Sequence, residues 1–439
     1  MLKSVLKARA KSFLSISLKK RTFLSNDYKC NENWNSAISS PLLNKINLND
    51  FYNKLDQTHS SKGIISAIDV DIFANAVTEP VHLEELKDLL HKLRLSAETG
   101  SMLESTSHAT VRHSIKFDYV DELIQMLKDP LNYGLFLDDY SANILLNELL
   151  VKKNYTQAAD IAALIMLQEE YNNDILCSLC QYSSYMFIKN YVEPEPAVME
   201  ENNKKVEEIK IRVKFLRNPY FDDHFDIKDR LKLAGKTLAW ISEKTSNTLN
   251  NNLQLIGWLI YKKYDQLLAT SEELCTNTKF RIYNEVIDLL NKELHKVEPE
   301  KKEVLEKCIS LLAKIEIIPT KPSLQASLTD NIENAINKTQ EKDVAAQKEL
   351  FILWEKTRQL KLEEQSHRLD RVKRVQIIEE KQRQLQEEEQ KLWFFENEEK
   401  IDLQIEDKEK LVDKTQTKKK VLTAIDENYI PPEILPKRR

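Results

Sequence analysis

The stretch YGLFLDDYSANILLNELLVKKNYTQAADIAALIM at residues 133–166 decides the fold, because its pattern predicts two helices joined by a turn. Asp138-Asp139 can accept the free amide groups of a helix start, and apolar side chains then recur at helical spacing from 142 to 150. Lys152-Lys153-Asn154 interrupts this pattern before a second apolar face, rich in alanine, runs from 155 to 166. A unit of this kind buries its apolar faces only by stacking on neighbouring units, so it predicts a repeat protein.

The same stretch resembles a pentatricopeptide repeat, and more narrowly it is similar to the mitochondrial small ribosomal subunit protein twenty-seven family. Its most specific points are the turn Lys152-Lys153-Asn154-Tyr155 and the following Gln168-Glu169. Leu137 departs from the repeat pattern, in which proline usually precedes the acidic cap. The resemblance is clearest over residues 115–190.

The resemblance implies a structural component of the mitochondrial small ribosomal subunit in the mitochondrial matrix, with a role in mitochondrial translation. The implied partners are small-subunit mitochondrial rRNA and other mitochondrial small-subunit ribosomal proteins. In pentatricopeptide proteins the first helix of each hairpin reads bases, and Asn143 stands near that place. A lone asparagine there is more often a solvated or capping residue. Lys152 and Lys153 are better candidates for phosphate contact, and the alternative is a pair of solvated turn lysines.

The flanking sequence predicts further helices. Apolar residues recur at helical spacing within 86–93, 117–127, 176–187, 253–267, 282–290 and 305–315. A charged, proline-bearing loop is expected near 190–217, and no stretch shows the sustained alternation of a half-buried strand. The expected fold is therefore all-α, an α-solenoid of degenerate pentatricopeptide-like hairpins over residues 79–320, preceded by an N-terminal extension at 26–78 and followed by a long charged C-terminal helix.

The composition excludes several classes of function. The chain has five glycines and twelve prolines in 439 residues, and the glycine-rich phosphate loops and the hydrolase nucleophile motif are absent. We therefore expect no enzyme, no catalytic residues, no cofactor and no small-molecule substrate. No run approaches 18 consecutive apolar residues, so we also expect no membrane span.

Residues 1–25 carry the physical signature of a mitochondrial transit peptide. They hold seven basic residues and no acidic one, together with serines and an amphipathic apolar series. A disordered basic tail, or a basic helix on a membrane or partner surface, is the alternative. Removal of the seven cations would move the formal net charge from −5 to −12. An acidic chain does not coat nucleic acid with its whole surface, so any RNA contact must be local.

Residues 323–412 predict a long charged helix that forms an arm. No glycine or proline occurs from 323 to 430, and residues 341–410 hold 19 acidic and 15 basic side chains. Such a run favours a helix with charge pairs four residues apart. Its apolar stripe is thin, with a regular heptad only at Ile378, Leu385 and Leu392, so we expect a mostly solvated helix that docks one stripe on a partner. A purely solvated spacer is the alternative.

Two further features near the C-terminus are candidate contact sites. Trp393, Phe394 and Phe395 cannot all share one helix face, so they are a candidate anchor into a partner, unless Trp393 and Phe394 fold back on the array. Residues 413–439 predict a basic flexible tail, in which Lys418, Lys419 and Lys420 are candidates for RNA contact.

Other polar motifs carry weaker predictions. Cys177 and Cys180 form a C-x-x-C without a second pair, so they favour small core residues over a metal site. Asp222-Asp223-His224 is of metal-ligand type, but a helix-entry turn is the better interpretation. We expect no metal site.

Two other classes of function are left open by the sequence. One is a free mitochondrial pentatricopeptide RNA-binding or processing factor, which would bind a defined single strand without ribosome association. The other is a cytoplasmic coiled-coil adaptor, which would keep its first 25 residues and dimerise through 341–410.

Overall fold

The computed structural model describes residues 22–192, 227, 229–277, 280–297, 299–318 and 322–423. The chain divides into two compact units, residues 1–358 and 359–439. The described residues of the first unit form paired helices in two layers, and the second unit holds the outer part of a long helix and a shorter helix after it. The prediction of an all-α, solenoid-like fold is confirmed.

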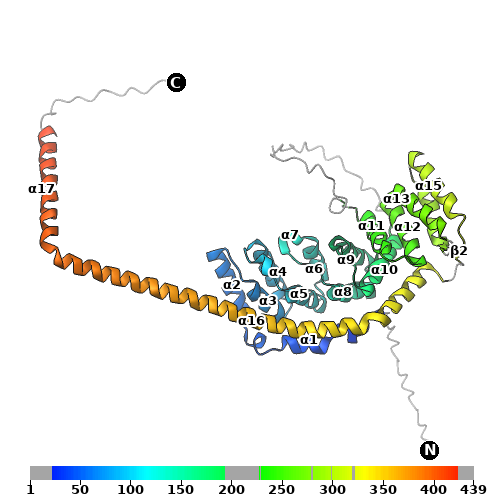
Figure 1. The fold of residues 1–439 in the computed structure, drawn as a ribbon, viewed down its shortest axis with the longest axis horizontal. Coiled ribbons are helices and arrows are strands. Elements are labelled where there is room, and N and C mark those ends of the chain that lie inside the picture. The colour runs from blue at the N-terminus through cyan, green and yellow to red at the C-terminus, as the bar shows by residue number, and fades with distance from the viewer. Residues whose placement is uncertain are drawn as a thin grey trace, which may run out of the picture. The chain divides into compact units, whose positions relative to one another are not determined.

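The first unit repeats one arrangement along its length (Figure 1). The helices α3, α5, α8 and α10 contact one another in sequence as one layer, and α6, α9 and α11 do so as the other. The pairs α12 with α14 and α13 with α15 continue the same alternation. Each hairpin therefore shelters the apolar side chains of its neighbours, as the stretch 133–166 predicts.

The helices named first in each hairpin are α3 (Ala67–Ala76), α5 (Glu104–Lys116), α8 (Asp139–Val151), α10 (Asp174–Asn190), α12 (Thr248–Tyr261) and α14 (Asn284–Leu294). The second helices are α4 (His82–Leu95), α6 (Val120–Lys128), α9 (Tyr155–Gln168), α11 (Arg230–Glu243), α13 (Tyr264–Thr276) and α15 (Pro299–Leu312). The remaining elements of this unit, apart from α16, are α1 (Asn31–Ile38), α2 (Leu48–Lys62), α7 (Pro130–Tyr133), three 3-10 turns (Asp27–Lys29, Leu43–Lys45, Thr99–Ser101) and the strands β1 (Ile282–Tyr283) and β2 (Ile317–Ile318).

The central hairpin begins and turns as its sequence dictates. The Asp138 carboxylate accepts a hydrogen bond from the Ser141 amide at 3.1 Å and so caps α8. The turn closes because Lys153 adopts a left-handed conformation with φ of 59°, and the Asn154 side chain then caps α9 by accepting from the Gln157 amide. Leu145, Leu146 and Ala162 are fully buried between the layers.

Several boundaries differ from the sequence prediction. The expected N-terminal extension contributes α1, α2 and α3 to the array, and its Tyr28 and Phe73 are fully buried. The pattern predicted across 253–267 is two helices, because Lys262 turns the chain with φ of 63°. Ile282 lies in a two-residue strand paired in parallel with β2, and α11 was not expected. The charged loop predicted near 190–217 lies outside the described residues from 193 onward.

The long charged C-terminal helix is present as α16 (Leu324–Glu396), and α17 (Glu398–Thr423) follows it. Its first part, residues 324–358, belongs to the array, where Leu324, Leu328, Ile332 and Phe351 are buried. The sequence did not show that the chain's own hairpins cover this part.

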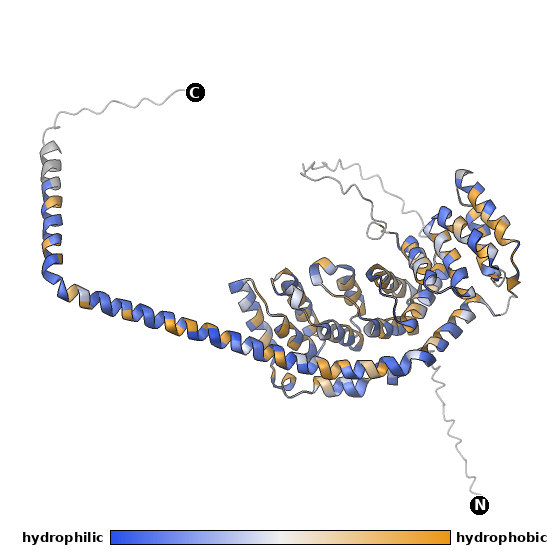
Figure 2. Cartoon of the chain, viewed as in Figure 1, coloured by the Kyte–Doolittle hydropathy of each residue, from blue (hydrophilic) through white to orange (hydrophobic). Residues whose placement is uncertain are grey.

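Among the described residues, the second unit consists of α16 from residue 359 onward and of α17. Its part of α16 ends where the Asn397 side chain donates to the Trp393 carbonyl at 3.0 Å, and α17 starts directly after it. Figure 2 shows that both helices are mainly hydrophilic, with hydrophobic residues at intervals. The helix α17 continues through residues 413–423, where the sequence predicted a tail, and residues 424–439 lie outside the described part.

Candidate functional site

The turn lysines lie at one edge of the array. The Lys152 ammonium forms an ion pair with Asp118 of the preceding hairpin, and this contact lowers the pKa of the Asp118 carboxyl. Lys153 is exposed. A phosphate would therefore meet Lys153 directly but would compete with Asp118 for Lys152. The RNA-contacting role of both lysines stays a prediction.

Asn143 lies in the interior instead of on the surface. Its side chain is fully buried, and its amide nitrogen donates to the Tyr28 hydroxyl at 2.9 Å. That hydroxyl donates to Asp343 of α16 at 3.2 Å, and Asp343 also accepts from Asn173 at 2.9 Å. The expectation of a solvated or capping asparagine is wrong, because α8 directs this side chain into the packing between the N-terminal segment and α16. Asn143 is consequently not carried into the RNA contact proposed below.

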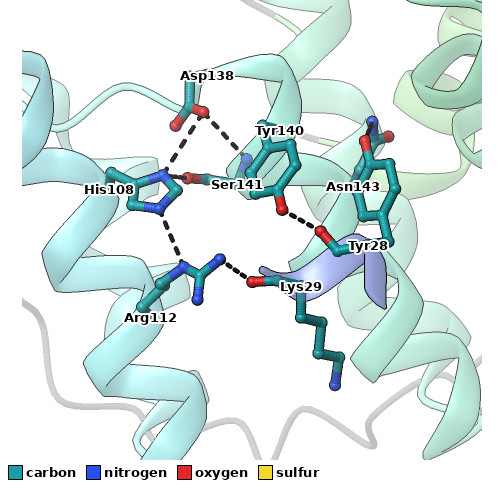
Figure 3. A network of polar contacts seen from close by, with 8 residues as sticks. All are labelled: Tyr28, Lys29, His108, Arg112, Asp138, Tyr140, Ser141 and Asn143. Atoms are coloured by element: carbon teal, nitrogen blue, oxygen red, sulfur yellow. Dashed lines mark hydrogen bonds and ion pairs between the residues drawn. The ribbon is translucent and has the colours of Figure 1, made fainter. Parts of the chain in front are cut away.

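Next to these hydrogen bonds lie Ser141, His108 and Asp138, which are the three residue types of a hydrolase catalytic triad (Figure 3). His108 Nδ1 is 2.8 Å from the Ser141 hydroxyl and 3.8 Å from the Asp138 carboxylate. In a catalytic triad the serine and the aspartate face opposite ring nitrogens. Here both face Nδ1, so the geometry is not that of an activated nucleophile.

The second ring nitrogen of His108 is already occupied. Arg112 Nε donates to His108 Nε2 at 3.0 Å, which assigns the proton of the neutral ring to Nδ1. Burial lowers the pKa of His108, which keeps the ring neutral. Arg112 also donates to the Lys29 carbonyl and lies over the Trp34 ring at 5.2 Å. The cluster therefore fastens the N-terminal segment to α5 and α8.

The C-x-x-C pair lies on α10 as two thiols. Cys180 is fully buried, Cys177 is partly buried, and burial raises the pKa of Cys177 to about 12. Thiols that resist ionisation are poor metal ligands and poor nucleophiles. Among the described residues, no three or more histidine, cysteine or acidic side chains gather as metal ligands would. Asp222-Asp223-His224 lies outside the described residues.

The predicted aromatic anchor lies at the end of α16. The side chains of Trp393, Phe394 and Phe395 are 59%, 41% and 69% exposed, and the last two rings meet edge to face with centroids 6.1 Å apart. Lys418, Lys419 and Lys420 lie within the helical backbone of α17. The structure does not test either set as a contact site, so both remain predictions.

A groove that the sequence did not reveal lies between α10, α12 and α14, with a volume of about 920 Å³. Five of its lining residues are lysines: Lys189, Lys262, Lys292, Lys296 and Lys301. Three are acidic: Glu285, Asp288 and Glu293. Five cations less three anions leave an excess of two positive charges in an otherwise acidic chain. The lining of the groove therefore carries a net positive charge, which attracts anions.

Tyrosines and one ordered acid shape the groove. Burial and the nearby Glu293 raise the pKa of Tyr264 to about 12, so its hydroxyl remains a hydrogen-bond donor. The Glu285 carboxylate accepts from the Leu324 amide at 2.9 Å and so holds the start of α16. Glu285 thus stabilises the helix start while it contributes its negative charge to the groove lining.

The groove could not be read from the sequence because four segments contribute to it. Its lysines lie between 189 and 301, and each segment by itself has ordinary helix-end lysines. The only local signal is the cluster of lysines from 292 to 302.

No helix among the described residues has the length and apolar character needed to cross a bilayer. A comparison with known protein families matches residues 1–420 to the model described as mitochondrial 28S ribosomal protein S27. The match covers nearly the whole chain, including the array, the groove and most of the arm.

Proposed function

Because the chain belongs to the mitochondrial 28S ribosomal protein S27 family, we propose that it is a structural, non-enzymatic component of the mitochondrial small ribosomal subunit. In the matrix it supports translation by holding small-subunit rRNA and neighbouring ribosomal proteins in place. The family match carries this proposal, and the two-layer array supports it, because stacked hairpins give a long and rigid surface for partners.

The groove is the part of the array that contacts rRNA in this proposal. Lys189, Lys262 and Lys292 are exposed at its rim, and Tyr264 supplies a hydroxyl donor. Contacts of this kind position a phosphate backbone without reading its sequence. Base reading by the hairpins has no support at Asn143, which is buried, so the free pentatricopeptide RNA factor is not favoured.

The arm is the part that reaches neighbouring proteins. Beyond residue 358, α16 and α17 present apolar side chains to solvent, with the aromatic residues 393–395 at the end of α16. The first part of α16 is held on the array by buried contacts, so a partner bound to the outer part would be attached to the whole scaffold.

Sedimentation of a mitochondrial lysate tests the ribosomal assignment. We expect the protein to migrate with small-subunit rRNA and to leave that fraction when the subunit is dissociated by chelation of Mg²⁺. The assignment fails if the protein stays at the top of the gradient while the rRNA sediments normally.

Charge reversal tests the groove separately. The triple variant Lys189→Glu, Lys262→Glu, Lys292→Glu should bind an rRNA fragment more weakly and lower the slope of log K against log salt by about 2–3 in magnitude. The matched control is Lys45→Glu, Lys54→Glu, Lys62→Glu, which changes the charge equally at exposed lysines elsewhere on the unit. Equal losses in both triple variants would assign RNA contact to overall charge and not to the groove.

A further inference from the structure

The outer part of α16 presents one continuous seam to solvent. Positions alternately four and three residues apart share one face of a helix and form the contact line of a coiled coil. Within the second unit this line runs through Leu360, Glu364, His367, Arg371, Arg374, Ile378, Lys381, Leu385, Glu388, Leu392 and Phe395. Its apolar members, Leu360, Ile378, Leu385, Leu392 and Phe395, are each more than half exposed.

The seam has a basic centre between apolar ends. His367, Arg371, Arg374 and Lys381 occupy four of its central positions, while leucines lie at both ends and a phenylalanine closes the second. Within the described part of the chain, no ion pair is made by Arg371, Arg374 or Lys381. Off the seam, by contrast, Arg383 pairs with Glu380 at 2.7 Å. Arg371, Arg374 and Lys381 are therefore available to the carboxylates of a partner.

A second copy of this chain does not fit the seam. In a parallel pair each seam position faces itself, so Arg371, Arg374 and Lys381 would each meet a like charge. One fully overlapping antiparallel register opposes Arg371 with Lys381 and Glu364 with Glu388. The other fully overlapping register leaves no layer with apolar residues on both sides. The first two arrangements are opposed by like-charge repulsion. The third lacks the apolar contact that drives association.

We propose that this seam binds an amphipathic helix of another protein, which is apolar at both ends of the contact and acidic at its centre. Such a helix would cover the exposed leucines and bring carboxylates to Arg371, Arg374 and Lys381. An RNA backbone matches the cations but leaves the leucines and Phe395 in water. The inference rests on the proposed function, because the partner is one of the neighbouring proteins of the scaffold.

Binding of two synthetic helical peptides to the full chain tests the seam. Both peptides are about five heptads long, with leucine at the seam positions that face Leu360, Ile378, Leu385 and Leu392. They differ only at the three positions that face Arg371, Arg374 and Lys381, which are glutamate in one peptide and lysine in the other. We expect the glutamate peptide to bind at least tenfold more tightly, measured by fluorescence anisotropy at physiological salt.

Two variants make the test specific. Arg371→Glu with Arg374→Glu should invert the preference between the peptides, while Arg383→Glu, on the outer face of the same helix, should leave it unchanged. Circular dichroism shows whether each variant keeps its helix content. Equal affinities for the two peptides, a glutamate peptide that does not bind, or a full chain that sediments as a dimer would each overturn the proposal.

Photocrosslinking in sedimented small subunits then shows whether protein or rRNA occupies the seam. A benzophenone side chain placed at Arg374 should crosslink to a protein segment whose helical seam carries acidic residues, and one placed at Arg383 should not. Crosslinks from Arg374 to rRNA overturn the proposal. If the chain never sediments with the subunit, the proposed function fails while the peptide result still decides the chemistry of the seam.

Discussion

Arg358 of α16 and Asp71 of α3 form a buried ion pair, in which Arg358 Nε donates to Asp71 Oδ2 at 2.7 Å. The two residues are 287 positions apart in the sequence, and the side chains are 5% and 0% exposed. The other carboxylate oxygen of Asp71 accepts from Ser105, from Thr106 at 2.9 Å and from Asn75 at 3.1 Å. Asp71 of α3 thus binds α5 through Ser105 and Thr106, and it binds α16 through Arg358, the last residue of the first unit.

Removal of the arginine should loosen α16 from the array. Arg358→Ala leaves the Asp71 carboxylate buried without its counter-charge, so we expect a loss of about 3–5 kcal/mol in the free energy of unfolding. Urea denaturation measures this loss, and hydrogen exchange should rise in residues 324–358. The control is Lys338→Ala, which breaks an exposed pair with Asp174 and should cost at most about 1 kcal/mol. Similar costs for both variants would show that the buried pair does not hold the helix.

Gly257 allows α11 and α12 to pack closely. A Cβ atom at Gly257 would lie 2.4 Å from the backbone nitrogen of Ala239, which neither helix can accept without moving. Gly257→Ala should therefore lower the unfolding midpoint, with a cost of at least about 1–3 kcal/mol from overpacking. The control is Gly100→Ala, because a Cβ there meets nothing within 4 Å. An unchanged midpoint in Gly257→Ala would contradict the close packing of these helices.

His113 should make the fold sensitive to acid. Burial is the largest cause that lowers the pKa of His113 from 6.5 to about 3, and Lys116 and Arg112 add to it. The unfolded chain therefore takes up a proton that the folded chain refuses, and stability that is complete above pH 6.5 falls as the pH drops toward 3. Over that window this residue contributes a loss of about 1.4 kcal/mol per pH unit.

His113→Phe should remove that contribution, because phenylalanine fills a similar space beside Phe117 and Trp34 without titrating. Denaturation at a series of pH values compares the two proteins, and the slope of stability against pH should be shallower in the variant. Parallel slopes would mean that His113 does not carry the acid sensitivity.

Asn147 holds the backbone at Phe23 and Leu24, within the predicted transit peptide. Its side-chain oxygen accepts hydrogen bonds from the backbone amides of Phe23 and Leu24, both at 3.1 Å, and Leu24 is buried. We expect the mature N-terminus to lie at or before Phe23, so the segment removed is shorter than 1–25. Mass spectrometry of the mature protein checks this position.

Truncation gives the matching stability test. A chain beginning at Thr22 should unfold at the temperature of the longer protein, whereas one beginning at Asn26 should unfold earlier. Asn147→Ala should have an effect of the same sign, at about 1–3 kcal/mol for each amide left without a partner. Equal midpoints for the two truncated chains would show that residues 22–25 contribute nothing to the fold.

The sequence by itself determined the repeating helical hairpin and the long helix. Helical spacing from Asp138 to Met166 requires one buried face on each helix, and the absence of glycine and proline from 323 to 430 allows α16 to run as far as Glu396. These are local properties, because caps, turns and apolar spacing act within a few residues of one another.

Only the tertiary structure decided what covers each face. Asn143 and the first part of α16 were expected to face solvent or a partner, yet both pack against segments more than one hundred residues away. A periodic apolar stripe predicts that one face of a helix is buried, but it does not identify the segment that buries it. The groove lysines and the pair of Arg358 with Asp71 arise from the same cause, since stacking brings together side chains that no spacing in the sequence connects.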